Sequence, residues 1–374
     1  MLFHSERIHR LHHLPLKIWV LAPHLVTSDA NIDYYYDFSQ SINEYTKVFE
    51  ELNLNWTWQP VTIEDYPVII QQIVEEKNQQ LVFPVVLNLC DGDEVNGTPG
   101  ISVVQMLQQK GLVYTGSDEH FYRITTSKIP MKQVFNLAGV NTPRWEVIRH
   151  GEQDLSGIFE RLGSPIMVKP AVSGGSMGVG TRNVVHNEEE LRQQVQQMFT
   201  GYRGWNLAID GIIAEEFILG AEFTTMILGS ALFPDQCHVL TPVERVFHVS
   251  LPETEKFLSF DRLWEIYEEE TPMPGEANFY EYELPDAHLH EPLKQISINA
   301  YRASGGTGYA RADIRMNQST GELYVLEVNA QCGLSEDEDY TSIGAILRMS
   351  GVSFTEAIAE IIEDAFRRNQ LILS

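Results

Sequence analysis

Short apolar runs alternate with stretches of helical periodicity over the first third of the chain. The apolar runs predict buried strands at residues 17–22, 55–61, 81–89 and 112–114. Between them, apolar residues recur every three or four positions, which predicts helices at residues 39–52, 66–77 and 101–109. Strands that alternate with helices in this way are typical of a parallel sheet. We therefore expect a Rossmann-like parallel-sheet domain in the N-terminal part of the chain.

The pattern changes beyond residue 117 into that of a small unit that mixes helices and strands. Helices are predicted there at residues 127–137, 155–162 and 188–199, and strands at residues 145–148, 165–169 and 181–185. A third unit begins near residue 211, with strands predicted at residues 212–217, 222–228 and 238–244. After a charged stretch at residues 252–292, helices are predicted at residues 293–303, 340–349 and 354–367. The predicted fold class is α/β (α+β), with a tail at 1–15 and three domains at 16–116, 117–210 and 211–374.

Two stretches on either side of residues 316–321 alternate apolar and polar residues, as half-buried strands do. The turn-rich connection between them predicts a hairpin. If the turn centres in this connection, Arg311 faces Asn329 and Asp313 faces Glu327. Residues two apart share one face of a strand, so the four side chains are predicted to form one cluster.

This cluster has the composition of a magnesium site. The carboxylates of Asp313 and Glu327 and the amide of Asn329 supply hard oxygen ligands, which suit a Mg²⁺ ion that also binds phosphate oxygens. Arg311 can hold a phosphoryl oxygen or a carboxylate through two hydrogen bonds. The alternative for a lone hairpin is a solvated face that carries salt bridges.

A glycine-rich run at residues 173–180 joins two predicted strands, where a Rossmann or P-loop motif would join a strand to a helix. Its glycines and Ser176 suit a flap whose backbone N–H groups can approach phosphate oxygens closely. Lys169, at the end of the preceding strand, would project a cation toward those phosphates, and Lys128 is a second candidate. Taken alone, the run is also compatible with a flexible loop, and each lysine with a position on the surface.

A third signal lies in two predicted strands that are separated by Leu219-Gly220. Backbone groups of residues 216–218 could recognise a purine edge, and Glu222 could accept hydrogen bonds from ribose hydroxyls. The alternative is a pair of ordinary strands with acidic residues at the rim.

The composition and net charge limit the binding partners and the cellular compartment that we expect for this protein. The formal net charge of −26 argues against nucleic acid or an anionic membrane as a partner. The three cysteines have no zinc-like spacing, and no apolar run approaches the roughly 20 residues that span a bilayer, so we expect a cytoplasmic protein. The four histidines within residues 1–14 could bind a metal, but a frayed tail is the expectation there.

Taken in order, these motifs resemble the ATP-grasp fold, and within it the D-alanine–D-alanine ligase branch. The resemblance covers roughly residue 81 to the C-terminal end. Its most specific parts are Lys128, the segments 114–117, 168–170, 174–180, 215–224, 279–283, 311–313 and 327–329, and Gly333. The resemblance implies a three-domain ATP-grasp fold that binds ATP between the second and third domains, and a homodimer.

The resemblance also implies the residues that bind ATP. Lys128 and Lys169 would contact the phosphates. The residues that would cover the phosphates are Gly175, Ser176 and Met177. The residues at the adenine would be Glu215, Glu216, Phe217 and Ile218, and Glu222 would lie at the ribose.

Metal binding and catalysis follow from the same resemblance. Asp313, Glu327 and Asn329 would hold Mg²⁺, as two ions, with Mn²⁺ as an alternative. Arg311 and the backbone N–H of Gly333 would stabilise the developing oxyanion and, with Lys169, form the catalytic set. The implied reaction is an ADP-forming condensation, in which a donor oxygen takes the γ-phosphoryl group and an amine then displaces phosphate. Catalysis would consist mostly of positioning and charge stabilisation.

The family's residues for two D-alanines are mostly replaced in this sequence. Gly175 stands in place of the first of two tandem serines, and Pro285-Asp286 in place of a Lys-Tyr pair. Glu338 stands where a serine binds the acceptor's carboxylate, and a glutamate would repel that group. The family's substrate-gripping glutamate after the first strand has no counterpart that the sequence identifies.

These departures predict substrates other than two D-alanines, for example an amino acid acceptor coupled to a mycosporine core through an activated enol or ketone oxygen. Trp56, Trp58, Tyr340 and the tyrosines at 34–36 could shape a site for a ring. One alternative is a genuine D-alanine–D-alanine ligase. Another is a non-catalytic ATP sensor, against which the presence of every expected metal ligand and phosphate lysine argues.

Overall fold

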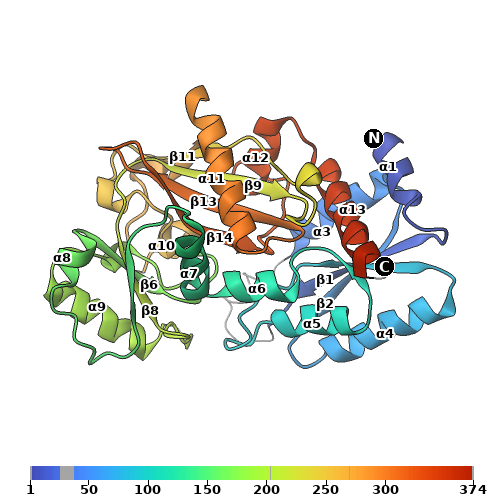
Figure 1. The fold of residues 1–374 in the computed structure, drawn as a ribbon, viewed down its shortest axis with the longest axis horizontal. Helices are drawn as coiled ribbons and strands as arrows, with labels where there is room; N and C mark the ends of the chain where they lie inside the picture. Colours follow the sequence, from blue (N-terminus) through green and yellow to red (C-terminus); the bar gives the residue numbers. More distant parts are fainter. Residues whose placement is uncertain (1, 26–37, 203, 269, 373–374) are drawn as a thin grey trace.

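The computed structural model describes residues 2–25, 38–202, 204–268 and 270–372. Its strands form three sheets, one in each part of the chain. The N-terminal elements lie at one end of the molecule and the central elements at the other, with most of the C-terminal elements between and above them (Figure 1).

The N-terminal sheet is parallel, as the alternation of strands and helices predicted. Its strand order is β2-β1-β3-β4. The strands are β1 (Leu16–Pro23), β2 (Asn55–Val61), β3 (Phe83–Asn88) and β4 (Val113–Tyr114). The helices are α3 (Ser39–Glu51), α4 (Tyr66–Gln79) and α5 (Ile101–Gln109). Helix α3 packs on one face together with the C-terminal helix α13 (Phe354–Ile372), and α4 and α5 pack on the other.

The central sheet has the order β5-β8-β6-β7 and is antiparallel. Its strands are β5 (Trp145–Ile148), β6 (Ile166–Pro170), β7 (Val184–Val185) and β8 (Ile212–Glu216). Helices α8 (Ile158–Leu162) and α9 (Glu188–Thr200) pack on it. The strand expected at 181–185 is shorter, because Thr181–Asn183 form a 3₁₀ turn. Strand β8 belongs to this sheet although it lies beyond residue 210, and the division into domains stays a prediction.

The C-terminal sheet follows the order β12-β11-β9-β13-β14, with β10 paired to β9. Its strands are β9 (Glu222–Leu228), β10 (His238–Val239), β11 (Val243–Phe247), β12 (Tyr280–Glu283), β13 (Tyr309–Met316) and β14 (Leu323–Ala330). The single strand predicted at 238–244 is therefore wrong. Pro242, which has no N–H to donate, separates β10 from β11.

Five further helices accompany this sheet: α6 (Glu119–Thr126), α7 (Lys128–Ala138), α10 (Phe260–Leu263), α11 (His290–Ala303) and α12 (Ser342–Ser350). Helices α6, α7 and α11 contact β14, and α12 contacts β9 and β11. The connections contain short 3₁₀ turns at Pro234–Gln236, Glu253–Glu255, Pro274–Glu276 and Ala287–Leu289.

The hairpin of β13 and β14 has the predicted register. Arg311 pairs with Asn329 and Asp313 pairs with Glu327, and the register shifts only beyond this point, between Asp313 and Ile314. The four side chains therefore share one face of the sheet, as the period of two requires.

The frayed tail expected at the N-terminus is wrong, because residues Leu2–His9 form helix α1. Ile8 is fully buried in the apolar cluster that includes α13, and Arg7 forms an ion pair with Glu363 of α13. His12 stacks on Phe83 with ring centroids 3.9 Å apart. Among the described residues, no group of three or more His, Cys, Asp or Glu side chains is placed to hold a metal ion.

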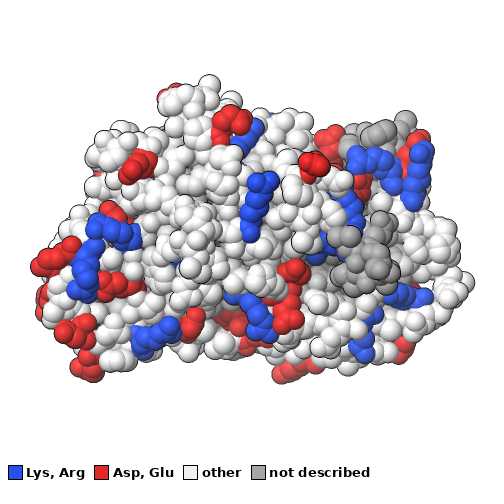
Figure 2. Space-filling model, viewed as in Figure 1, with Lys and Arg blue, Asp and Glu red and all other residues white. Residues whose placement is uncertain are grey.

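The charges are dispersed on the face shown in Figure 2, where Lys and Arg side chains form small separate groups among Asp and Glu. The whole sequence contains 52 acidic residues and 26 basic ones. Among the described helices, none has both the length and the apolar character that crossing a membrane requires.

Docking of α1 can be tested with Ile8→Ala. The side chain is 0% exposed, and removing a buried isoleucine costs about 2–5 kcal/mol of folding free energy. We expect the thermal unfolding midpoint to fall by several degrees, measured by circular dichroism. Glu6→Ala is the matched control, because Glu6 is exposed on α1 and forms an ion pair with the exposed Arg10 just after the helix. Equal midpoints for the two variants would mean that α1 is not docked.

Candidate active site

One cleft of about 680 Å³ is lined by all the residues that the family resemblance assigns to ATP, magnesium and catalysis. It is lined by the glycine loop, by the edge of the central sheet, by the hairpin face and by the loop after β3. The expected residues that line it are Lys128, Lys169, Gly175, Ser176, Met177, Glu215, Glu216, Phe217, Ile218, Glu222, Arg311, Asp313, Glu327, Asn329 and Gly333. The structure thus brings them together, while their individual roles stay predictions.

The hairpin cluster is held by a hydrogen-bond network. Arg311 donates to Asp313 Oδ2 from Nη2 at 2.9 Å and from Nε at 3.1 Å. The Asn329 amide donates to both carboxylates, at 3.1 Å to Asp313 and at 3.2 Å to Glu327. Arg311 also lies 3.5 Å from Ser342 Oγ at the start of α12. These contacts hold the two carboxylates side by side.

The side chains of the hairpin cluster themselves suit a divalent cation. Asp313 is 7% exposed, and its Oδ1 is a buried atom that accepts no hydrogen bond from the described residues. An unused carboxylate oxygen beside a second carboxylate is a suitable ligand for Mg²⁺. Burial alone would raise the pKa of Glu327, but Lys128, Lys169 and Arg311 lower it to about 2, so this ligand is ionised at neutral pH.

The two expected phosphate lysines are paired with carboxylates from different sheets. Lys128 Nζ lies 3.4 Å from Glu327 on β14, and Lys169 forms an ion pair with Glu215 on β8. Lys132, which the sequence analysis missed, lies 2.8 Å from the other oxygen of Glu215. Burial would raise the pKa of Glu215, but the two lysines hold it below its usual value. Lys132 lies four residues after Lys128 on the buried face of α7, which is the signal that could have identified it.

Glu222 is also held more firmly than the sequence indicated. Its carboxylate forms an ion pair with Arg245 of β11, and its second oxygen lies 3.8 Å from Arg315 of β13. The guanidinium of Arg245 also lies over the rings of Tyr280 and Tyr282, at 5.6 and 5.7 Å from their centroids. Both arginines were missed, although each is a charged position in an alternating strand. The role of Glu222 at the ribose stays a prediction.

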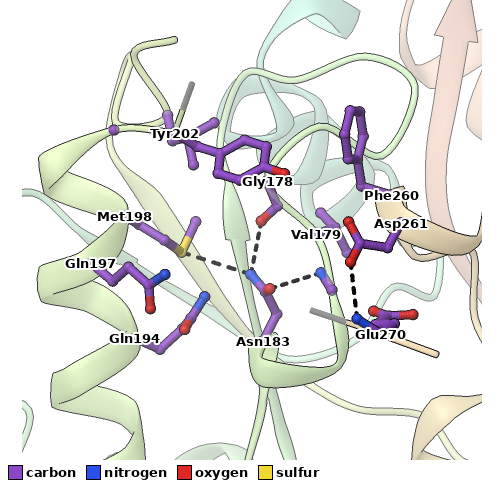
Figure 3. Close-up of a pocket in the computed structure, with 13 residues that line it drawn as sticks. Gly178, Val179, Asn183, Gln194, Gln197, Met198, Tyr202, Phe260, Asp261 and Glu270 are labelled. Carbon is purple, nitrogen blue, oxygen red and sulfur yellow. Dashed lines mark hydrogen bonds between the residues drawn. The ribbon is translucent and has the colours of Figure 1, made fainter. Parts of the chain in front are cut away.

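The base of the glycine loop is fixed by one buried amide (Figure 3). Asn183 Nδ2 donates to the carbonyl oxygens of Val168 at 2.6 Å and Gly178 at 3.0 Å. Its Oδ1 accepts from the Gly180 N–H at 2.8 Å. These contacts border a small cavity of about 60 Å³ behind the loop.

The charged stretch at 252–292 holds the outer part of the glycine loop. Trp264 Nε1 donates to the Gly175 carbonyl at 2.9 Å, and the Phe260 N–H donates to the Val179 carbonyl at 2.8 Å. Glu270 accepts from the Thr181 N–H at 2.9 Å, at the end of the loop. The glycine loop is therefore not a free flexible segment, which was the alternative for this run.

The structure changes the expectation for the acceptor side. Glu338 lies 3.6 Å from Arg348 of α12 and does not line the cleft, whereas Ser335 and Ser342 do. The repulsion expected from Glu338 is therefore absent from the cleft. Trp56 and Trp58 pack against the N-terminal apolar cluster, so they do not form a substrate site.

Of the other aromatic residues expected at a substrate site, Tyr340 does line the cleft. The tyrosines at 34–36, and the expected loop after the first strand, lie outside the described residues.

Curated relatives carry ligase names. The chain is 27% identical over 328 residues to D-alanine–D-alanine ligase B of Xanthomonas campestris pv. campestris, covering 86% of this chain and 89% of the relative. It is 29% identical over 294 residues to the uncharacterized protein y4sG of Sinorhizobium fredii, covering 76% and 75%.

Solved structures share the fold at lower identity. The D-alanine–D-alanine ligase from Bacillus anthracis, crystallised with ATP, matches 96% of this chain and 99% of its own with a TM-score of 0.64 and 19% identity. The VanG D-Ala:D-Ser ligase from Enterococcus faecalis matches 94% and 100% with a TM-score of 0.66 and 16% identity. At these identities the likeness supports the fold alone.

The family model for the D-ala D-ala ligase C-terminus matches residues 134–363, which is more than half of the chain. This range contains β6, the glycine loop, β8, β9 and the whole hairpin. The chain therefore belongs to the D-alanine–D-alanine ligase family of ATP-grasp proteins, a family of ATP-dependent, ADP-forming carbon–nitrogen ligases.

Proposed function

We propose that this protein phosphorylates an oxygen of a donor substrate with Mg·ATP and couples the donor to the amine of an amino acid. The observation that carries the proposal is the meeting of two opposite charge sets in one cleft. Asp313 and Glu327 lie on the hairpin, and the cations Lys128, Lys169 and Arg311 face the same cleft. This combination suits the transfer of a phosphoryl group, which needs a metal and fixed cations.

Each element of the cleft supports one part of the reaction. Asp313, Glu327 and Asn329 would hold Mg²⁺, which we propose as two ions, and Mn²⁺ would suit the same oxygen ligands. Magnesium neutralises phosphate charge when it is bound. Lys128 and Lys169 would bind phosphate oxygens below the glycine loop. Arg311 and the Gly333 N–H would stabilise charge on the reacting oxygen.

The adenine and ribose would lie toward the central sheet. Strand β8 ends at Glu216, and the backbone groups of Phe217 and Ile218 line the cleft just beyond it. Glu215, which contacts Lys132 and Lys169, lies near the end of the same strand, and Glu222 lies at the start of β9.

The first candidate substrates are two D-alanines. The names of the curated relatives support this choice, and so does the position of Glu338 outside the cleft. Ser335 and Ser342 line the cleft where an acceptor carboxylate could be bound. A second candidate is a ring-shaped donor such as a mycosporine core, which the aromatic lining of Tyr280, Tyr282 and Trp264 would suit.

A panel of substrates separates these candidates. ADP release is measured with Mg·ATP and single or paired D- and L-amino acids, and with mycosporine-glycine, and the products are identified by mass. ADP with D-alanine alone supports the first candidate, and ADP only with a ring donor supports the second. ATP binding without ADP release across the panel would support a non-catalytic sensor instead. Light scattering on the same sample tests the homodimer that the family resemblance implies.

Removal of either hairpin carboxylate should abolish turnover. We expect Asp313→Asn and Glu327→Gln each to lower kcat by at least about a hundredfold, because each removes charge that fixes the metal. Glu322→Gln is the matched control, since Glu322 lies on the same hairpin at its exposed turn and outside the cleft. ADP release at rising Mg²⁺ concentration is the measurement. Near-normal rates in both cleft variants would contradict the magnesium assignment.

Removal of Lys169 of β6 should weaken the use of ATP by the enzyme. Lys169→Ala should raise the KM for ATP or lower kcat by about ten- to a hundredfold, because a buried cation that faces the phosphates is lost. Lys110→Ala provides the control, as Lys110 is exposed directly after α5, lies outside the cleft lining, and its ammonium group donates a hydrogen bond to Gln71. Steady-state kinetics with ATP as the varied substrate gives both constants. An unchanged rate in Lys169→Ala would show that the loop and lysine do not bind phosphate.

A further inference from the structure

We propose that Asp91 binds the amine of the acceptor and takes its proton before the amine attacks. The role rests on the proposed ligase function and extends it to a residue that the sequence analysis did not single out. It also names the chemical class of the acceptor, which enters the cleft as a cationic primary amine.

Asp91 lies where the parallel sheet meets the hairpin. It follows β3, at the carboxyl end of the parallel strands, which is where open α/β sheets bind their ligands. A hydrogen bond of 2.9 Å from Gln331 Nε2 to the Asn88 carbonyl ties this strand end to the end of β14. Asn88 lies three residues before Asp91, and Gln331 lies two residues after Asn329. The loop carrying Asp91 is therefore fastened beside the hairpin cluster.

The backbone around Asp91 is fixed from other directions as well. The Tyr122 hydroxyl donates to the Gly92 carbonyl at 2.8 Å, and the Cys90 N–H donates to Asn88 Oδ1 at 3.2 Å. Gly92 also bridges to Gly100 across the loop. The carboxylate thus starts from a defined backbone position, although its side chain is exposed to the cleft.

Asp91 differs from the other acidic residues of the cleft in having no partner on another described residue. Those others are all compensated: Glu215, Glu216, Glu222, Asp313 and Glu327 contact lysine or arginine, and Asp93 accepts from Val95 and Asn96 of its own loop. Within the described part of the chain, the Asp91 carboxylate forms no ion pair, and its hydrogen bond is to its own backbone N–H.

The groups that surround Asp91 leave its charge uncompensated. Those on its own loop are Asp93 and Glu94, both acidic. Those on other elements are Tyr122 of α6, Tyr309 of β13 and Cys332 after β14, all neutral at pH 7. Although the side chain is open to the cleft, the protein that walls the cleft raises the pKa of Asp91 to about 6, with a smaller contribution from Asp93. The carboxylate is therefore ionised at pH 7.5, where it attracts an ammonium group, and becomes neutral as the pH falls through about 6.

The step balances as a proton transfer followed by substitution. The acceptor's ammonium gives one proton to the Asp91 carboxylate and becomes a neutral amine. Its nitrogen then bonds to the activated carbon, the bond from that carbon to the phosphoryl oxygen breaks, and phosphate leaves with the electron pair. The second proton of the nitrogen goes to the leaving phosphate, and Asp91 returns its proton to water. A carboxylate with a pKa near 6 suits this exchange at neutral pH.

The test separates amine activation from phosphoryl transfer. The variant is Asp91→Asn, assayed with D-alanine, or the donor that the panel identifies, in the presence of Mg·ATP. One assay supplies the amino acid acceptor and measures the coupled product. The other supplies hydroxylamine, which is already neutral at pH 7 and needs no proton acceptor, and measures the hydroxamate formed from a carboxylate donor or the oxime formed from a ring donor. Asp235→Asn is the control, since Asp235 is exposed and is not among the residues that line the cleft.

We expect Asp91→Asn to lower coupling to the amino acid by at least about a hundredfold while formation of the hydroxamate or oxime and the KM for ATP stay close to wild type. The acid limb of the acceptor's kcat/KM, centred near pH 6 in the wild type, should disappear in the variant. An equal fall in both assays, or no change in either, would overturn the role of Asp91. No ADP release by the wild type with any donor would instead overturn the proposed function, and this role with it.

Discussion

Mutual compensation of buried charges is the constraint on which this cleft depends. Taking a lysine or a carboxylate out of water is costly unless an opposite charge is close. Here the partners come from different elements: Lys128 of α7 meets Glu327 of β14, and Lys169 of β6 meets Glu215 on the neighbouring strand β8 of the same sheet. The pair of Lys128 and Glu327 is satisfied only when α7 lies against β14 of the C-terminal sheet, so this pair favours the arrangement that forms the cleft.

The same pairs suit the binding of a charged ligand. Phosphate groups would take over Lys128 and Lys169, and a divalent ion would take over Asp313 and Glu327. In both cases the buried charges of the protein have an opposite charge beside them before and after binding. A ligand that carries both phosphate and a divalent ion therefore leaves no buried charge without a partner. A ligand with only one of these charges would leave its counterpart unpaired, which favours the metal–nucleotide complex over either part.

The hairpin was predictable from the sequence because a period of two fixes which residues share a face. Once the turn was placed, Arg311, Asp313, Glu327 and Asn329 could only cluster, and the observed register agrees. The parallel direction of the N-terminal strands was also predictable, because strands and helices alternate along this part of the sequence. In both cases a local repeat determines a tertiary outcome.

What could not be predicted depends on contacts between segments far apart in the sequence. Lys132 is an ordinary helical lysine until Glu215 lies opposite it, 2.8 Å away. Helix α1 has a weak apolar pattern, and only its docking on α13 turns Ile8 into a core residue. Glu338 occupies the expected place in the sequence, but its pairing with Arg348 removes it from the cleft. A sequence motif shows where a charged residue lies along the chain. Which part of the molecule its charge affects depends on the oppositely charged residue that it meets in the fold.

Charge compensation would also allow one cleft to distinguish the two proposed substrates. The half that faces Lys128, Lys169 and Arg311 offers cations and carboxylate ligands, so it would favour the phosphates of ATP and the donor oxygen that is to be activated. The half beside β3 offers the uncompensated carboxylate of Asp91 and no cation among the described residues around it. An amino acid carries both charges, so under the proposed role of Asp91 it would bind there with its ammonium toward this carboxylate. Its nitrogen would then be presented to the activated donor, while its carboxylate would point toward Ser335 and Ser342, and the order of charges along the cleft would set the direction of the bond that forms.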